Sequence, residues 1–215
     1  MSRPVSPPAP GLPRRIRFAA AVCLVLSGLT GLFSLKEALE LGHLSEVKEA
    51  QLARLPSMGD AAMNAAFIEA YHAAIEPMRE PRSLILVALS VACAFTFIAS
   101  SRLLRPDGLP LESMRRLLGG AAIVTAILRT MDGAQFAVVF RRMGEALGQV
   151  MSLPPDIQDP AEIAMMRAFA PVFMTTAAVL WTALVAGSFA LLGQYFRSER
   201  VRQVITAQDG PQEED

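Results

Sequence analysis

Four long apolar stretches constrain the fold of this chain more than any other feature of its sequence. They run over residues 16–35, 83–101, 117–140 and 170–195. At about 1.5 Å of rise per residue, roughly 20 helical residues cross the apolar core of a bilayer, which is about 30 Å thick. The chain, in which 53% of 215 residues are hydrophobic, is therefore predicted to be all-α, a bundle of four transmembrane helices.

Only the third stretch carries charges near its middle, namely Arg129 and Asp132. Each charge costs about 2.5–3.5 kcal/mol near the bilayer centre, so we expect both to face the bundle and, three residues apart, to pair. Thr125 and Gln135 extend this candidate polar site. It could serve as a proton relay, an anion site or a substrate contact, or it could be a neutral pair that fixes helix orientation. Because the other three stretches lack central charges, support from other helices is expected from hydroxyl groups alone.

The distribution of basic residues predicts the orientation. Eleven arginines fall in 52 residues on one side, against eight lysines and arginines in 76 residues on the other. The arginine-rich segments are 1–17, 102–116 and 196–215, and the others are 36–82 and 141–169. Positive charge accumulates in cytoplasmic loops, so both termini are predicted to be cytoplasmic. Arginine outnumbers lysine eighteen to two, a bias that favours a bacterial source and hence the bacterial inner membrane.

The segment 36–82 is predicted to be an extracytoplasmic helical hairpin between the first two spans. Pro56 to Gly59 has turn composition, and apolar side chains recur after it at helical spacing. This interaction stripe consists of Met63, Phe67, Ala70, Ala74 and Met78. It requires a partner, which could be the first helix, a second copy of the chain, or another membrane or extracytoplasmic protein.

The remaining segments are assigned by composition. Residues 1–15 contain five prolines and are predicted to be a disordered cytoplasmic leader. Residues 102–116 form a basic cytoplasmic loop and 196–215 a cytoplasmic tail. In the outer loop 141–169, Asp159 and Pro160 have the composition of a helix start, and Pro171 is expected to mark a bend or a restart of the helix.

Small side chains recur every four residues on three of the four spans, which favours close helix packing. The three ladders are Ala19, Cys23, Ser27 and Gly31; Ala88, Ala92, Thr96 and Ser100; and Ala178, Thr182, Ala186 and Ala190. Trp181, near the middle of the fourth span, is expected to pack between helices.

Motifs for enzymes and cofactors are absent from the sequence. Glu40 precedes His43 by three residues, and Glu69 precedes His72 in the same way. This spacing occurs in di-metal helix bundles, but we expect no metal here, because many glutamates crowd this segment and His72 is predicted to lie on a solvated face. The net charge of zero gives no argument for nucleic acid. The preferred function is therefore a non-enzymatic interaction, assembly or sensing component acting through the hairpin. A small oligomeric transporter or channel using Arg129 and Asp132 is the alternative, and a metal-dependent membrane enzyme comes third.

Overall fold

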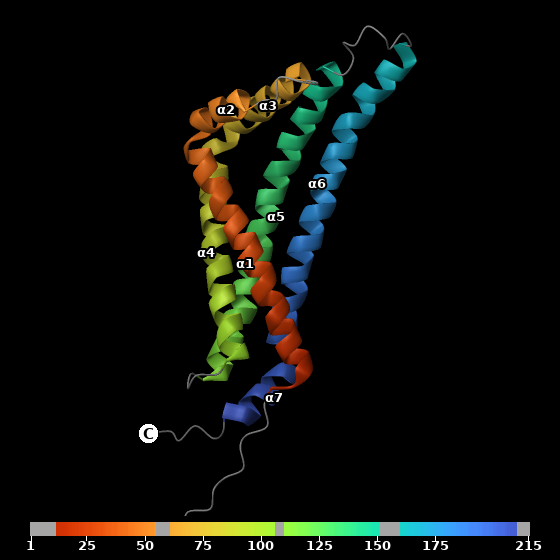
Figure 1. Cartoon of the computed structure of the whole chain (residues 1–215). Helices are drawn as coiled ribbons and strands as arrows, with labels where there is room; N and C mark the ends of the chain where they lie inside the picture. Colours follow the sequence, from red (N-terminus) through yellow and green to blue (C-terminus); the bar gives the residue numbers. More distant parts are fainter. Residues whose placement is uncertain (1–11, 55–60, 106–109, 151–159, 210–215) are drawn as a thin grey trace, which may run out of the picture. The chain divides into compact units, whose positions relative to one another are not determined.

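The computed structural model describes residues 12–54, 61–105, 110–150 and 160–209. Within these ranges the chain is helical and contains no strand, which confirms the all-α prediction. Figure 1 shows the elements in chain order, which are α1 (Arg14–Gly42), α2 (Leu44–Ala53), α3 (Ala61–Ile75), the 3₁₀ turn η1 (Glu76–Met78), α4 (Arg79–Leu104), α5 (Leu111–Val150), α6 (Pro160–Arg197) and α7 (Glu199–Asp209).

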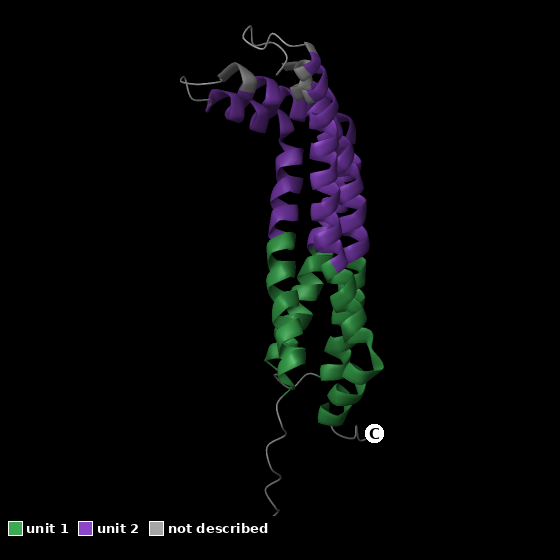
Figure 2. Ribbon diagram, turned by 90° about the vertical axis from the view of Figure 1, so that its right-hand side faces the viewer, with its two compact units in different colours: residues 1–31, 91–125, 188–215 green, residues 32–90, 126–187 purple. Residues whose placement is uncertain are grey.

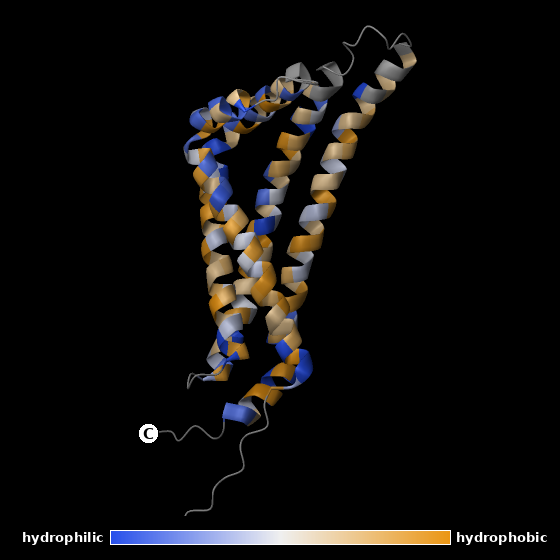
Figure 3. Ribbon diagram, in the orientation of Figure 1, coloured by the Kyte–Doolittle hydropathy of each residue, from blue (hydrophilic) through white to orange (hydrophobic). Residues whose placement is uncertain are grey.

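Four helical segments are long and apolar enough to cross a membrane, as the four-span prediction requires. They are Arg14–Gly42, Asn64–Leu104, Leu111–Ala146 and Arg167–Arg197. Each contains one of the four apolar stretches of the sequence. Figure 3 shows apolar residues along most of α4 and α6, whereas polar residues recur along α5.

The chain divides into two compact units, each built from parts of α1, α4, α5 and α6 (Figure 2). Unit 1 comprises residues 1–31, 91–125 and 188–215, and unit 2 comprises residues 32–90 and 126–187. The core of unit 1 includes Cys23, Leu103 and Phe196. The core of unit 2 includes Leu41 and Val139.

The small-residue ladders lie at the packed faces of their helices, which confirms the packing prediction. All of their members except Ala88 are buried or half-buried. The third span uses a glycine for the same purpose, because a Cβ atom added at Gly133 would collide with the side chain of Thr182. Close approach of backbones is the usual means of joining helices in lipid, where the hydrophobic effect contributes little.

The helix α6 begins at Pro160, as the sequence predicts, and continues through Pro171. The chain therefore does not restart a helix at Pro171, and the Thr175 hydroxyl donates to the Pro171 carbonyl at 2.7 Å. Trp181 is 59% exposed, so the expectation that it packs between helices was wrong. Near Trp181 the buried face of α6 is formed by smaller side chains, which are Ala178, Thr182, Val185 and Ala186, and Trp181 lies outside that face.

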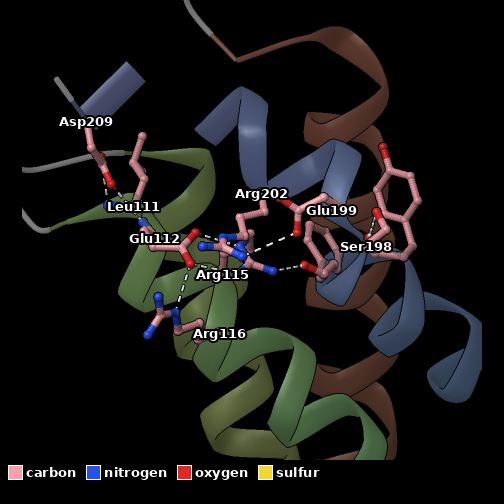
Figure 4. A network of polar contacts seen from close by, with 10 residues as sticks. Leu111, Glu112, Arg115, Arg116, Ser198, Glu199, Arg202 and Asp209 are labelled. Atoms are coloured by element: carbon pink, nitrogen blue, oxygen red, sulfur yellow. Dashed lines mark hydrogen bonds and ion pairs between the residues drawn. The ribbon is translucent and has the colours of Figure 1, made fainter. Parts of the chain in front are cut away.

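In unit 1, the short helix α7 packs on the start of α5 (Figure 4). Val201 and Ile205 of α7 belong to the unit 1 core, and the Asp209 carboxylate accepts hydrogen bonds from the backbone N–H groups of Leu111 at 3.0 Å and Glu112 at 2.9 Å. An acidic side chain in this position satisfies free N–H groups at the start of a helix and interacts favourably with its dipole. The predicted tail therefore contains a helix that caps α5.

Buried Arg115 joins this end of α5 to the end of α6. Its guanidinium donates to the Phe196 carbonyl and binds Glu112 at 2.7 Å, and Glu112 also accepts from Arg116 (Figure 4). Two of the arginines in the predicted basic loop, Arg115 and Arg116, thus have specific partners in the structure.

In unit 2, α1 ends at Gly42, and the helices α2 and α3 follow it in the chain. The Arg79 side chain at the start of α4 donates to the Gly42 carbonyl at 2.6 Å, which satisfies one of the carbonyl groups left free at the end of a helix. The helices α2 and α3 contact each other (Figure 1). We call these two helices the α2–α3 pair; the location of this pair outside the membrane stays a prediction.

Candidate functional site

The predicted polar site on α5 is centred on Asp132, which is fully buried. Arg129 Nη1 donates to Asp132 Oδ2 within the same helix, and the Arg129 side chain is mostly buried. Gln135 lies one turn further along and is half-buried. Thr125 belongs to unit 1, where its hydroxyl lies 3.5 Å from that of Thr96.

A second cation, Arg82 of α4, reaches Asp132 from another helix. Arg82 is only 1% exposed, and its Nη2 lies 3.1 Å from Asp132 Oδ1 and donates to Glu37 Oε1 of α1 at 2.6 Å. The contact with Asp132 is an ion pair without hydrogen-bond alignment, since Asp132 Oδ1 has no hydrogen-bond partner in the described part of the chain. We call Glu37, Arg82, Arg129 and Asp132 the ionic cluster. It holds two positive and two negative groups, so the charges compensate one another.

The expectation that only hydroxyl groups would support Asp132 from other helices was wrong. Arg82 directly precedes the charge-free stretch of the second span, so counting charges within the stretch left it out. A long arginine side chain can extend its head group well away from its own backbone position. The useful signal was the presence of an arginine and a glutamate, Arg82 and Glu37, flanking adjacent spans at the same predicted end of the bundle.

Several buried polar atoms near the cluster have no hydrogen-bond partner within the described ranges. They are Arg82 Nε and Nη1, Arg129 Nε, Asp132 Oδ1 and Gln135 Oε1. Arg82 is partly compensated by the ring of Phe136, whose centroid lies 4.6 Å from the guanidinium carbon. Buried polar groups are normally paired, so the ionic cluster has capacity for further polar contacts.

A cavity of about 380 Å³ lies in unit 2 and is lined by residues of α1, α2, α3 and α5. Its polar lining consists of Glu37, Glu40, Gln51, Tyr71 and His72. Glu37 belongs to the ionic cluster, so the cluster holds one wall of the cavity in place. A cavity of several hundred Å³ with a mostly apolar wall and a few polar groups is typical of a small-molecule site.

His72 is 3% exposed, so its predicted place on a solvated face was wrong. The helix α2 covers His72 itself, because His72 Nε2 lies 3.2 Å from Gln51 Oε1 of α2. The imidazole also packs edge-on against Tyr71. His72 Nδ1 is buried and has no hydrogen-bond partner among the residues that the structure describes. Glu69, three residues earlier, is exposed.

The interaction stripe on α3 is mostly covered by the chain itself. Ala74 is buried in the unit 2 core with Leu41 of α1, and Met78 packs against that core. Phe67 lines the cavity, and Ala70 is half-buried. The side chain of Met63 lies outside the described residues. Part of this stripe is thus covered within the chain, whereas a second copy or another protein as its partner stays a prediction.

The remaining candidate metal ligands do not come together into a metal site among the described residues. In the described ranges no group of three or more His, Cys, Asp or Glu side chains could hold a metal ion. His43 is exposed, with its Nδ1 at 3.2 Å from the Leu39 carbonyl oxygen.

Comparison with known proteins adds no family, since no family model, curated protein or solved structure matches this chain. A proposal for its function therefore rests on the chemistry of the cavity and of the ionic cluster.

Proposed function

We propose that this chain is a non-enzymatic integral membrane protein that binds a small amphipathic molecule in the unit 2 cavity. We further propose that it is a sensing component, which signals occupancy through the α2–α3 pair to a second copy or to another membrane or extracytoplasmic protein. The observation that carries the proposal is the cavity itself, about 380 Å³ in volume and lined by residues of α1, α2, α3 and α5.

The walls of this cavity differ in how firmly they are held. Glu37 of α1 is tied to Arg82 of α4 and, through it, to Asp132 of α5. On α3, Phe67 is partly exposed and Ile68 is half-buried, and the described polar contact between α2 and α3 is the one between Gln51 and His72. Elements with few buried contacts open at low free-energy cost, so occupancy of the cavity would act mainly on the α2–α3 pair.

A binding role fits the charges better than catalysis does. The two carboxylates of the ionic cluster are both paired with arginine, whereas a general acid or base must exchange protons with a substrate. Compensated charges of this kind hold neighbouring helices in one arrangement. The cluster is therefore proposed to be the rigid frame of the binding site.

The proposed orientation places both termini in the cytoplasm of a bacterium and the α2–α3 pair outside its inner membrane. In a cysteine-free background (Cys23→Ala, Cys93→Ala), a cysteine at exposed Ala50 of α2 should react with a membrane-impermeant maleimide in intact cells. A cysteine at exposed Gln203 of α7 should react only after permeabilisation. The reverse pattern would contradict the orientation.

Binding is tested by filling the cavity. Val47 lines it, and Ala50, three residues along the same helix, is exposed and does not. Native mass spectrometry of the purified protein should detect a small-molecule adduct on the wild type and on Ala50→Trp, but not on Val47→Trp. Removing the adduct should speed hydrogen exchange in α2 and α3, because these helices form its wall. Equal adducts on all three proteins, or none on any, would refute the proposal.

The transport alternative rests on the buried carboxylate of Asp132. It is less favoured by the geometry, because Asp132 would have to leave both Arg82 and Arg129 to carry a proton or bind a substrate ion. Proton or ion flux into liposomes that depends on the protein and is abolished in Asp132→Asn would support transport over binding.

A further inference from the structure

The charged groups that line the cavity are all acidic. Glu37 and Glu40 line it, whereas neither Arg82 nor Arg129 does, and no lysine or arginine is among its described lining residues. Arg82 Nη2 is bound to Glu37, so the cluster presents its carboxylate to the cavity. Glu40 pairs with Lys36 at 2.9 Å, but the Lys36 side chain is 69% exposed. Water screens an exposed pair of this kind and leaves it weak, so Glu40 can exchange this partner for another at small cost.

Aromatic rings give the same wall an affinity for cations. Phe67, Tyr71, Phe136 and Phe140 all line the cavity. Arg82 already lies over one face of Phe136, which shows that a ring of this wall accepts a positive group. A cation positioned over an aromatic face is attracted by the ring quadrupole, and more strongly when water is excluded.

His72 supplies an independent polar atom with an unused hydrogen-bonding capacity. It lines the cavity and is almost fully buried, and its Nδ1 has no hydrogen-bond partner among the described residues. When Nε2 donates its proton to Gln51 Oε1, Nδ1 is left as an acceptor, and an ammonium or hydroxyl hydrogen would satisfy it. The remaining wall is aliphatic, including Leu41, Leu44 and Val47.

From these groups we infer that the ligand is an amphipathic organic cation, an amine with an apolar body. Its ammonium group would lie among the Glu40 carboxylate, the aromatic rings and His72, and its apolar body would lie against the aliphatic wall. This inference rests on the proposed binding function and specifies the chemistry of its ligand.

Three probes with one skeleton and different head groups test the inference. They are 4-phenylbutylamine, 4-phenylbutanol and 4-phenylbutanoate, titrated calorimetrically into the full chain in detergent, with empty micelles subtracted. The amine should bind with a Kd at least tenfold lower than the alcohol or the carboxylate. The filled variant Val47→Trp should bind none of them.

Two substitutions should change the Kd of the amine in opposite directions. Glu40→Gln should raise the Kd of the amine at least fivefold and leave that of the alcohol unchanged, because only the amine uses the carboxylate. Lys36→Met should lower the Kd of the amine about twofold, since it frees Glu40 from its partner. The matched control is Glu46→Gln, which removes an acidic side chain that is exposed on α2 and does not line the cavity, and it should change nothing.

The failures of the two proposals can be told apart. Alcohol or carboxylate binding as tight as amine binding, or an unchanged amine Kd in Glu40→Gln, would overturn the cationic ligand while leaving a binding cavity in place. Absence of any difference between wild type and Val47→Trp for all three probes would overturn the binding function itself.

Discussion

The two units are built from parts of the same four long helices, yet they treat polar groups differently. In unit 1 the buried hydroxyl groups of Ser27 and Thr96 donate to carbonyl groups of their own helices, and the ionic groups, including buried Arg115, sit at the ends of α5, α6 and α7 (Figure 4). In unit 2 full charges are buried midway along α5 and beside a cavity. Hydroxyl groups bonded within a helix and ionic groups at helix ends contribute to packing and capping, whereas charges buried midway along a helix need charged partners from other helices. Unit 2 is therefore the better candidate for function.

The largest loss of stability is expected from removing the Asp132 carboxylate, which both buried arginines of the ionic cluster share. Asp132→Asn leaves Arg82 and Arg129 without a compensating charge on α5, and breaking a buried ion pair in this way costs about 3–5 kcal/mol. Unfolding in mixed detergent–SDS micelles measures the loss.

Replacing the whole ionic cluster provides the control for that prediction. The variant Glu37→Gln, Arg82→Met, Arg129→Met, Asp132→Leu has no buried charge left in the cluster, so it should be more stable than Asp132→Asn. A single variant Asp132→Asn as stable as wild type would mean that the cluster does not hold unit 2 together.

The contrast also explains what could be predicted from the sequence. The spans follow from runs of apolar residues, and the pairing of Arg129 with Asp132 follows from their separation of three residues in a helix. The contribution of Arg82 depends on how two helices pack and how far a side chain extends, which periodicity does not encode. The cavity and the burial of His72 depend on α2 folding against α3, which no pattern within either helix specifies.

The next largest effect on stability is expected from substitutions of two glycines of unit 2 by alanine. Gly133→Ala places a methyl group against Thr182, whereas a Cβ at Gly187 meets nothing within 4 Å. Overpacking costs about 1–3 kcal/mol, whereas replacing an unhindered helical glycine by alanine gains about 0.5–1 kcal/mol. The two substitutions should therefore shift the unfolding midpoint in opposite directions, and shifts of the same sign would contradict the close approach of α5 and α6 at Gly133.

A smaller effect is expected in unit 1, where Asp209 caps α5. Asp209→Ala removes an acceptor for the Leu111 and Glu112 N–H groups, and loss of a cap costs about 0.5–2 kcal/mol. Hydrogen exchange should accelerate in the first turn of α5 and leave unit 2 unchanged. Gln203→Ala, an exposed change on the same helix, is the control; equal acceleration in both would contradict capping of α5 by the Asp209 carboxylate.

The smallest expected effect on stability comes from an exposed ion pair of α5, which can be compared with the buried pair on the same helix. Arg141 pairs with Glu145 at 3.1 Å, one turn apart as Arg129 and Asp132 are, but the Arg141 side chain is 70% exposed and that of Asp132 fully buried. Exposed helical pairs contribute about 0.3–0.5 kcal/mol because water screens the charges and two long side chains must be ordered. Arg141→Ala should therefore barely move the unfolding midpoint that Arg129→Ala lowers strongly, because the latter leaves Asp132 with Arg82 as its one remaining partner among the described contacts. If the two substitutions cost the same, burial would not be what separates the ionic cluster from an ordinary surface pair, and the case for unit 2 as the functional half of the chain would lose its physical basis.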